Sequence, residues 1–496
     1  MPVLIRNVRL VALDGPAPQD LVDVRVRDGR VVEVGPGLTA DADQSYDAEG
    51  GWLMPGLWDQ HVHLGQWSLS SARLDLAPAR SAAQAVEMVR ERLAAHPDAP
   101  VVGWGHRPTD WDEAPVVSQL DAIETDQPII LIAGDGHHGW LNTIALHHLA
   151  LPTREGVVSE GEWFQAYGRL AAMFSADVTG PEAYRRAMEA ALAMGVVGVV
   201  DFEFSGGVED WVARWEGGAD LLRVSMATYA EGLEDVIARG LRSGDPLIPG
   251  QPLLTMGPFK IISDGSLNTR TAWCCDPYAE KAVLGFPHGQ PNQGPEELRA
   301  LLTRATGAGL SVAVHAIGDR AVTEALAAIA DSGATGTIEH AQLTTLDDVR
   351  RMAELGVRAS VQPAHLIDDR DVTDRLWPGR GERCFALRWM LDAGVQLAFG
   401  SDAPVARLDP WLAAATAVDR DASRGEPWHP EQAVTVREAL AASTDGWGTV
   451  APGHPGDLVL LDADPLAGDS DLDHAIRLRG FADHVRAVWV AGEQRL

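Results

Sequence analysis

Short apolar runs recur along the middle of the chain, and segments with helical periodicity separate many of them. The runs predict strands centred on residues 59–64, 197–203, 223–229, 259–264, 312–317, 337–342, 359–364 and 397–402. Helical patterns follow at 295–308, 320–331 and 346–355. Strands that alternate with helices run parallel, and eight of them predict an α/β fold of the (β/α)8 TIM-barrel type.

The two ends of the chain have a different pattern, in which apolar and polar positions alternate. Residues 23–27 and 30–34 alternate on either side of Asp28-Gly29, which is a strong hairpin signal. Residues 457–462 and 485–490 are also strand-like. We therefore expect a small composite β-sandwich domain from residues 1–54 and 447–496, with the barrel at 55–446.

The stretch from 65 to about 185 is too long for one barrel connection. It contains strand-like runs at 101–105 and 128–132, together with several helical segments. We predict an inserted subdomain at about 65–185, after the first barrel strand.

Composition and charge narrow the class of protein. The 496 residues carry a formal net charge of −31 at pH 7, which argues against nucleic acids and anionic membranes as partners. No apolar run approaches the ~20 residues of a membrane span, and the first residues lack the pattern of a signal peptide. The chain has three cysteines, and this odd number argues against a framework of disulfide bonds. We expect a cytoplasmic protein that binds a small-molecule substrate.

Lysine is rare in this chain, and its placement is informative. Among 40 basic residues only Lys260 and Lys281 are lysine, and Lys260 lies in the apolar run 259–262. A desolvated lysine can lose its proton, whereas arginine does not. The neutral amine can add carbon dioxide and become a carbamate, an oxygen ligand that can bridge two metal ions. A lysine that reaches solvent from a strand end is the alternative, and Lys260 alone does not decide between them.

Histidines and an aspartate occupy the ends of the predicted strands. His61 and His63 are two residues apart, so their side chains face the same side of a strand. His315, His340 and Asp402 each end a later apolar run. A lone histidine at such a place is usually a core residue, but core packing does not readily explain this set with Lys260. Active sites of TIM barrels lie at these carboxyl ends of the strands.

These residues stand in motifs that resemble the amidohydrolase superfamily, in particular its branch of N-substituted formamide deformylase-like proteins (amidohydrolase family 3). The similarity covers nearly the whole chain, through residues 55–63, 131–137, 259–266, 270–272, 314–319, 338–341, 361–363, 400–404 and 456–459. A single His-x-His is unspecific, whereas this ordered set is specific. Two features depart from the family pattern: Asn268 replaces a glycine or small residue, and the segment between Thr444 and Val450 is shortened.

The resemblance implies a site for two divalent metal ions, most often zinc. It implies that His61, His63 and Asp402 hold one ion and that His315 and His340 hold the other. A carboxylated Lys260 and a hydroxide would bridge the two ions. The hydroxide would be present at neutral pH because zinc lowers the pKa of bound water to about 7. Asp402 would also accept the hydroxide proton and pass it to the leaving amine. The implied reaction is hydrolysis of an amide-type C–N bond in an N-acyl or N-formyl amine. The resemblance also implies a homodimer.

Four further residues are candidates for substrate binding. The resemblance slightly favours His137 as a pocket residue over a surface histidine. Arg270 is a candidate clamp for a substrate carboxylate, although an arginine on a loop is usually solvated or ion-paired. Trp104 and Tyr278 are candidate pocket residues, with core or lid packing as the alternative. Glu339, beside His340, is expected to support a ligand.

Three other functions compete with this interpretation. Mononuclear deaminases of the superfamily place a glutamate three residues after the fifth-strand histidine, where this chain has Gly318. That difference and the presence of Lys260 favour the binuclear hydrolase. The same metal pair could instead hydrolyse a cyclic amide, a lactone or an ester, and the sequence leaves this open. A non-catalytic scaffold is remote, because such proteins usually lose metal ligands and all six are present here.

Overall fold

The structure is a computed structural model, and it describes residues 2–40, 44–71, 73–97, 99–108, 111–134, 138–170, 180–204, 206–282, 284–468 and 470–496. The chain divides into two compact units, which are described separately below. The first consists of Met1–Leu64 and Met188–Leu496, and the second of Gly65–Ala187.

A barrel of eight parallel strands forms the larger part of the first unit. Its strands, in spatial order, are β6 (Leu57–Val62), β12 (Val196–Asp201), β13 (Arg223–Thr228), β14 (Leu254–Ile262), β15 (Val312–Ala316), β16 (Gly336–His340), β17 (Arg358–Val361) and β18 (Leu397–Phe399). Most of their side chains are buried, as expected where parallel strands are covered on both faces. The predicted (β/α)8 barrel is confirmed.

The barrel is closed where its first and last strands meet. The Asp402 amide donates to the His61 carbonyl at 2.6 Å, and the His63 amide donates to the Ala403 carbonyl at 2.9 Å. Val62 and Ala403 form the corresponding parallel bridge. This seam, the junction of β6 with residues 400–404 after β18, therefore brings three of the predicted ligand residues to one place.

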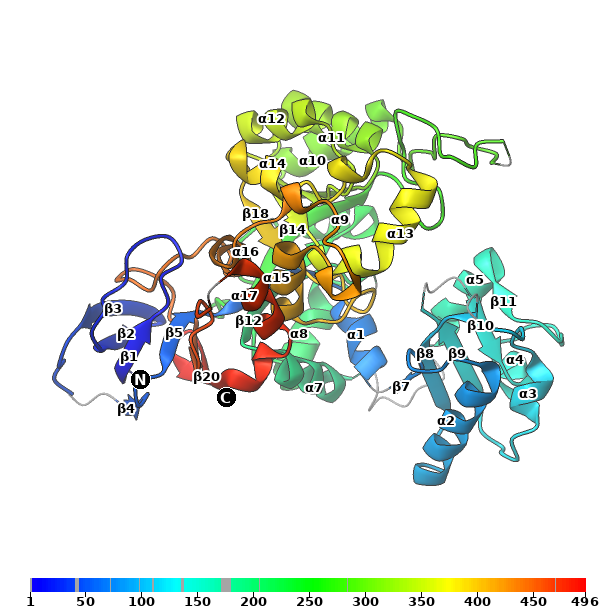
Figure 1. The fold of residues 1–496 in the computed structure, drawn as a ribbon, viewed down its shortest axis with the longest axis horizontal. Coiled ribbons are helices and arrows are strands. Elements are labelled where there is room, and N and C mark those ends of the chain that lie inside the picture. The colour runs from blue at the N-terminus through cyan, green and yellow to red at the C-terminus, as the bar shows by residue number, and fades with distance from the viewer. Residues whose placement is uncertain are drawn as a thin grey trace. The chain divides into compact units, whose positions relative to one another are not determined.

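Helices α10 (Pro295–Gly307), α11 (Asp319–Ser332) and α12 (Leu346–Leu355) follow three successive strands and pack side by side (Figure 1). Local sequence signals set their ends. Pro295 begins α10 at a position that needs no amide hydrogen, and Thr345 caps α12 by accepting from the Asp348 amide. The other helices of this unit are α8 (Val208–Glu216), α9 (Ala230–Ala238), α13 (Leu366–Leu376), α14 (Leu387–Asp392), α15 (Pro410–Asp419), α16 (Val436–Ala442) and α17 (Asp471–Leu478).

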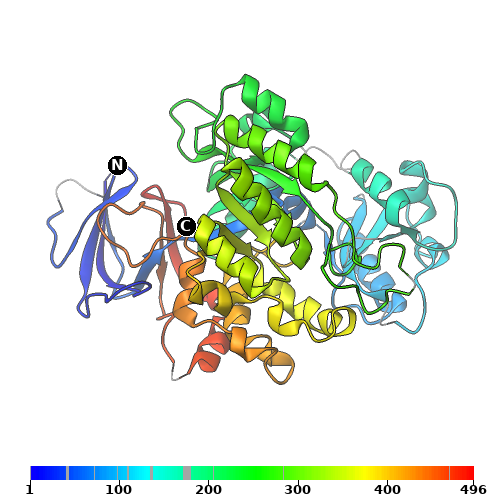
Figure 2. The ribbon, with the colours of Figure 1, turned by 90° about the horizontal axis from the view of Figure 1, so that it is seen from above.

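Strands from both ends of the chain form a second sheet of the first unit. Its members are β1 (Val3–Leu10), β2 (Val22–Arg27), β3 (Arg30–Gly35), β4 (Gln44–Asp47), β5 (Trp52–Pro55), β19 (Leu458–Leu461), β20 (Val485–Val490) and β21 (Glu493–Gln494). β19 pairs antiparallel with β5, so N-terminal and C-terminal strands lie side by side (Figure 2). The β2–β3 turn has positive φ at both Asp28 and Gly29, as its hairpin type requires.

The second unit is built around a five-stranded sheet. The strands are ordered β11 (Val158–Ser159), β10 (His138–Leu141), β9 (Ile129–Ala133), β8 (Val101–His106) and β7 (Leu74–Asp75). Ile129 and Leu131 belong to one apolar cluster and Ile130 and Ile132 to another, because alternate residues of a strand face opposite sides. The helices are α2 (Ala82–Ala95), α3 (Val117–Asp121), α4 (Thr143–His148) and α5 (Glu160–Leu170). Two more helices cross the limits of this unit, α1 (Leu64–Ser71) and α7 (Pro181–Leu192).

Across the parts of the chain that the structure describes, no helix has both the length and the apolar character needed to cross a membrane.

The composite sheet has a buried apolar core that its C-terminal strands help to fill, and this generates a stability prediction. Leu460 in β19 is fully buried in that core. Leu460→Ala should lower the free energy of unfolding by about 2–5 kcal/mol, because it leaves a cavity. The matched change Leu472→Ala, at a half-exposed position of α17, should change it by less than about 0.5 kcal/mol. Urea unfolding measures both, and equal effects would contradict this account of the core.

Candidate metal centre

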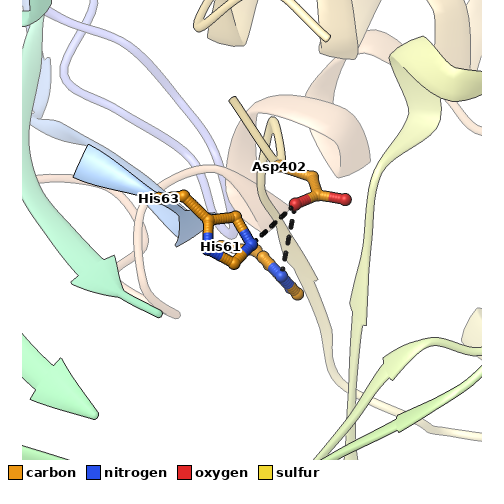
Figure 3. A group of neighbouring side chains, drawn as sticks. All are labelled: His61, His63 and Asp402. Atoms are coloured by element: carbon orange, nitrogen blue, oxygen red, sulfur yellow. Dashed lines mark ion pairs between the residues drawn. The ribbon is translucent and has the colours of Figure 1, made fainter. Parts of the chain in front are cut away.

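Three of the predicted ligands meet at the seam of the barrel. His61 and His63 come from β6 and its carboxyl end, and Asp402 follows β18. The Asp402 Oδ1 atom is 3.5 Å from His61 Nε2 and 3.2 Å from His63 Nε2 (Figure 3). All three residues are buried. One carboxylate oxygen therefore faces two imidazole nitrogens at the carboxyl end of the barrel strands.

The backbone around these ligands is held by a second carboxylate and by a close approach. Asp59 Oδ1 accepts from the amides of His61 at 3.1 Å and Ser401 at 2.9 Å, so it joins the two sides of the seam. A Cβ atom at Gly400 would lie 2.6 Å from the His61 nitrogen, which leaves room only for glycine. The run Gly400-Ser401-Asp402 thus places Asp402 because its first residue can pass so close to β6.

His340 and His315 lie beside this group. The His340 ring centroid is 4.9 Å from that of His61 and 4.5 Å from that of His315. His315 Nε2 is 3.3 Å from the Gly265 carbonyl oxygen and 3.5 Å from Asp264 Oδ1. The five predicted histidine and aspartate ligands therefore form one continuous cluster.

Two residues of the cluster have unusual backbone conformations. His340 has a φ of 69° and Asp402 a φ of 57°. Few residues other than glycine adopt this left-handed region, which costs free energy and is concentrated at functional sites. The fold holds both side chains in place at the expense of local strain.

Lys260 is buried on β14 with only 2% of its surface exposed. Its Nζ atom lies 4.0 Å from the centroid of the Phe202 ring, and no hydrogen-bond partner for it exists among the described residues. Burial lowers the pKa of Lys260 to about 8. A buried ammonium group without a hydrogen-bond partner is unfavourable in such surroundings, so Lys260 gives up its proton, or accepts a modification, more readily than an exposed lysine does.

Three members of the cluster, His61, His315 and Asp402, are shifted toward the protonation states that metal ligands need. Burial, with the nearby charge of Lys260, lowers the pKa of His61 well below its usual range, and burial lowers that of His315 to about 4. Burial alone would raise the pKa of Asp402, but His61 and His63 beside it bring it well below the usual value. Burial lowers the pKa of His63, but its hydrogen bond to Asp402 outweighs this and raises it. The result is a carboxylate among largely neutral imidazoles, which is a donor set suited to divalent metal ions.

Glu339 supports His61 from the side away from Asp402. Its Oε2 atom lies 2.7 Å from His61 Nδ1, and the Thr337 hydroxyl donates to its other oxygen. A carboxylate at Nδ1 keeps the proton there and leaves the Nε2 lone pair free toward Asp402. This is the supporting role expected for Glu339.

The described residues contain two groups whose ligand atoms all lie within 4.8 Å of one another, and Asp402 belongs to both. The first is His61, His63 and Asp402, and the second is His340, His365 and Asp402. The sequence had left His365 without a role. A signal was present, since His365 lies two residues after the motif residues 361–363, which begin at the carboxyl end of β17. These shared groups, with the unpartnered Lys260 amine, fit a metal centre.

The structure gives local contacts for three of the four predicted substrate residues, and the fourth lies outside the described residues. Arg270 forms an ion pair with Glu280, with 2.7 Å between Nε and Oε2. Tyr278 is buried in an apolar cluster, and its hydroxyl donates to the Ala272 carbonyl at 3.0 Å. Trp104 belongs to the second unit, where its ring lies 5.5 Å from the Arg73 guanidinium. His137 lies outside the described residues. The contacts of Arg270 and Tyr278 are those of ion pairing and core packing.

Comparison with known proteins identifies the family. The model of the amidohydrolase family matches residues 44–495. The chain belongs to the amidohydrolase family. This confirms the resemblance inferred from the motifs.

Individual relatives agree with this assignment over nearly the whole length. Protein LONG AFTER FAR-RED 3 of Arabidopsis thaliana is 28% identical over 92% of this chain and 87% of its own. N-substituted formamide deformylase of Arthrobacter pascens is 24% identical over 97% of each chain. The crystal structure of a metal-dependent hydrolase from Pyrococcus furiosus superposes with a TM-score of 0.79 at 25% identity, over 94% of this chain and 100% of that one. This amidohydrolase is thus a metal-dependent hydrolase.

The burial of Lys260 generates a pH-dependent stability prediction for the metal-free protein. Its folded-state pKa of about 8 lies below the ordinary 10.5. Below pH 8 both states carry the charge, so the net cost of burying it, about 3 kcal/mol after the attraction of Glu339 and Asp402, opposes folding. Between about pH 8 and 10.5 the unfolded state holds more protons, so stability rises with pH. Lys260→Met should therefore stabilise the metal-free protein at pH 7, by a margin that shrinks as the pH approaches 10.5.

Urea unfolding of chelator-treated protein at pH 7 and pH 10 measures this margin. Lys281→Met, which changes the other lysine at an exposed position, is the matched control and should have little effect at either pH. A Lys260→Met variant that is less stable than the unchanged protein at pH 7 would show that the buried amine has a stabilising partner.

Proposed function

We propose that this amidohydrolase cleaves an amide-type C–N bond in an N-acyl or N-formyl amine. The observation that carries the proposal is the cluster of His61, His63 and Asp402 together with the buried, unpartnered Lys260 amine. A relative of matching length is named as a deformylase of N-substituted formamides, which supports this substrate class.

Two divalent metal ions, with zinc as the leading candidate, are proposed for the site. His61, His63 and Asp402 would hold one ion and His315 and His340 the other, with Lys260 bridging as a carbamate. Bound there, the ions would supply a hydroxide nucleophile at neutral pH and polarise the substrate carbonyl. The lowered pKa of Lys260 favours carbamate formation, because the neutral amine attacks carbon dioxide, forms one N–C bond and releases one proton.

The residues of the site divide the remaining work. Asp402 is anionic, so it can accept the proton of the hydroxide that attacks the carbonyl carbon, and it can then give this proton to the departing nitrogen. Glu339 keeps His61 in one tautomer and orientation through the contact at Nδ1. Burial of the whole group excludes competing water and strengthens the electrostatic interactions.

Phe204 suggests the character of the substrate. It follows β12 and is 56% exposed, and its ring stacks on that of His63 with centroids 4.8 Å apart and an angle of 23°. An exposed aromatic ring against a candidate metal ligand offers an apolar surface to a substrate at the metals. We therefore propose that the amide carries an apolar substituent.

Metal content tests the role of Lys260. Protein prepared with zinc and bicarbonate should contain about two zinc ions per chain, and Lys260→Ala should lower this to one or fewer because the bridging ligand is lost. Lys281→Ala is the matched control and should keep both ions. Elemental analysis gives the metal-to-protein ratio. Two ions and full activity in Lys260→Ala would refute the carbamate.

A substrate panel tests the reaction. N-formyl and N-acetyl derivatives of aromatic and short alkyl amines should release one amine and one carboxylate each, and the aromatic amides should react faster because of Phe204. A chelator should abolish the release and zinc should restore it. Amine formation is followed by derivatisation and chromatography. If zinc-loaded protein cleaves only lactones, esters or cyclic amides, or only releases ammonia from deaminase substrates, the amide proposal fails.

A further inference from the structure

One polar side chain at the candidate metal centre, that of His365, has no part in the proposed reaction, although it belongs with His340 and Asp402 to a group that fits a metal ion. His365 Nε2 lies 3.9 Å from Asp402 Oδ2, on the opposite carboxylate oxygen from the one that faces His61 and His63. The atom is buried, and the structure shows no hydrogen-bond partner for it within the described ranges. A buried ring nitrogen left without a hydrogen-bond partner in a mostly satisfied interior calls for a ligand.

His365 is held in a defined position. It ends a short 3-10 turn (Pro363–His365) after β17 and directly precedes α13. One turn further on, Asp369 accepts from Asn268 Nδ2 at 3.1 Å and from Gln342 Nε2 at 2.9 Å. These two bonds tie the start of α13 to the segments after β14 and β16. Asn268, the position that departs from the family pattern, is therefore part of the support of His365.

The ring of His365 lies farther from that of His340 than the rings of two other cluster histidines do. The rings of His315 and His61 approach His340 to 4.5 and 4.9 Å, whereas His365 stacks on His340 at 6.2 Å. The 3.9 Å between Nε2 and Asp402 Oδ2 is too long for a direct hydrogen bond. The two atoms are therefore separate hydrogen-bonding positions, and one amide group could use both, with its nitrogen at Asp402 and its oxygen at His365.

We propose that His365 is a catalytic residue that donates a hydrogen bond from Nε2 to the carbonyl oxygen of the scissile amide. The role rests on the proposed amide hydrolysis, and it requires an imidazole hydrogen on Nε2. As the nucleophile attacks, negative charge grows on this oxygen, so the hydrogen bond strengthens toward the transition state. Loss of one such donor lowers kcat by about 10²–10³-fold in other hydrolases.

Two substitutions at His365 test the donor. His365→Leu removes it and His365→Gln keeps an N–H group. Both variants should keep the metal content of the unchanged protein. On the best amide of the panel, His365→Leu should lower kcat about 10²–10³-fold with little change in KM, and His365→Gln should recover part of the loss. His484→Leu, at a surface histidine paired with Asp462, is the matched control and should change neither quantity.

A substitution at Asn268 tests whether the hydrogen bonds to Asp369 hold His365 in position. Asn268→Leu removes one of the two bonds to Asp369, so it should lower kcat less than His365→Leu does. Because Asn268 acts through His365, the double variant should be no slower than His365→Leu alone. Additive losses would place Asn268 in a different role and would remove the argument that α13 positions His365.

Binding of acetohydroxamate, followed by calorimetry on zinc-loaded protein, provides a readout that needs no turnover. His365→Leu should weaken it at least tenfold at equal metal content. Loss of zinc in His365→Leu would make His365 a metal ligand, and unchanged kcat and affinity would leave it a packing residue; either result overturns the proposal. If no amide is cleaved, the proposed reaction fails, while acetohydroxamate affinity still decides for or against His365.

Discussion

The closure of the barrel between its first strand and the segment after its last is the constraint on which the metal centre depends. His61 and His63 lie near the start of the chain and Asp402 near its end, yet two backbone hydrogen bonds across the seam place them side by side. Asp59 strengthens the same junction by accepting from the Ser401 amide, 342 residues away. Any change that opens the seam would therefore separate these candidate ligands. Gly400 shows how tight this junction is, since no larger residue fits against His61.

Burial then sets the chemistry of the residues that the seam brings together. It drives His61 and His315 toward the neutral form and Lys260 toward the free amine, while the adjacent histidines keep Asp402 ionised. The same low-dielectric surroundings make each unpaired charge costly, so the metal-free cluster works against folding. The strained backbone at His340 and Asp402 also lowers stability, which indicates that the fold places these side chains for function.

Membership of the amidohydrolase family accounts for the barrel and for hydrolysis with metal ions, but not for the substrate. Residues outside the ligand set carry that information. Phe204 presents an apolar ring against His63, and the network of Asn268, Asp369 and Gln342 fixes the helix that begins beside His365. Each of these side chains follows a barrel strand or lies on the helix after one, where loops can vary without disturbing the strands.

The sequence by itself determined the barrel and the candidate ligands, because both depend on local patterns. Apolar runs alternating with helices predicted all eight strands, and the spacing of His61 and His63 set their common face. The composite sheet was also readable, through the alternation around Asp28-Gly29 and the strand-like runs near the C-terminus. Only the tertiary structure decided which side chains meet. It brought His365 to Asp402, gave Arg270 an ion pair with Glu280 and buried Tyr278 in the core. Each of those contacts joins a side chain to a partner whose direction and distance depend on loop geometry, which no periodicity in the chain encodes.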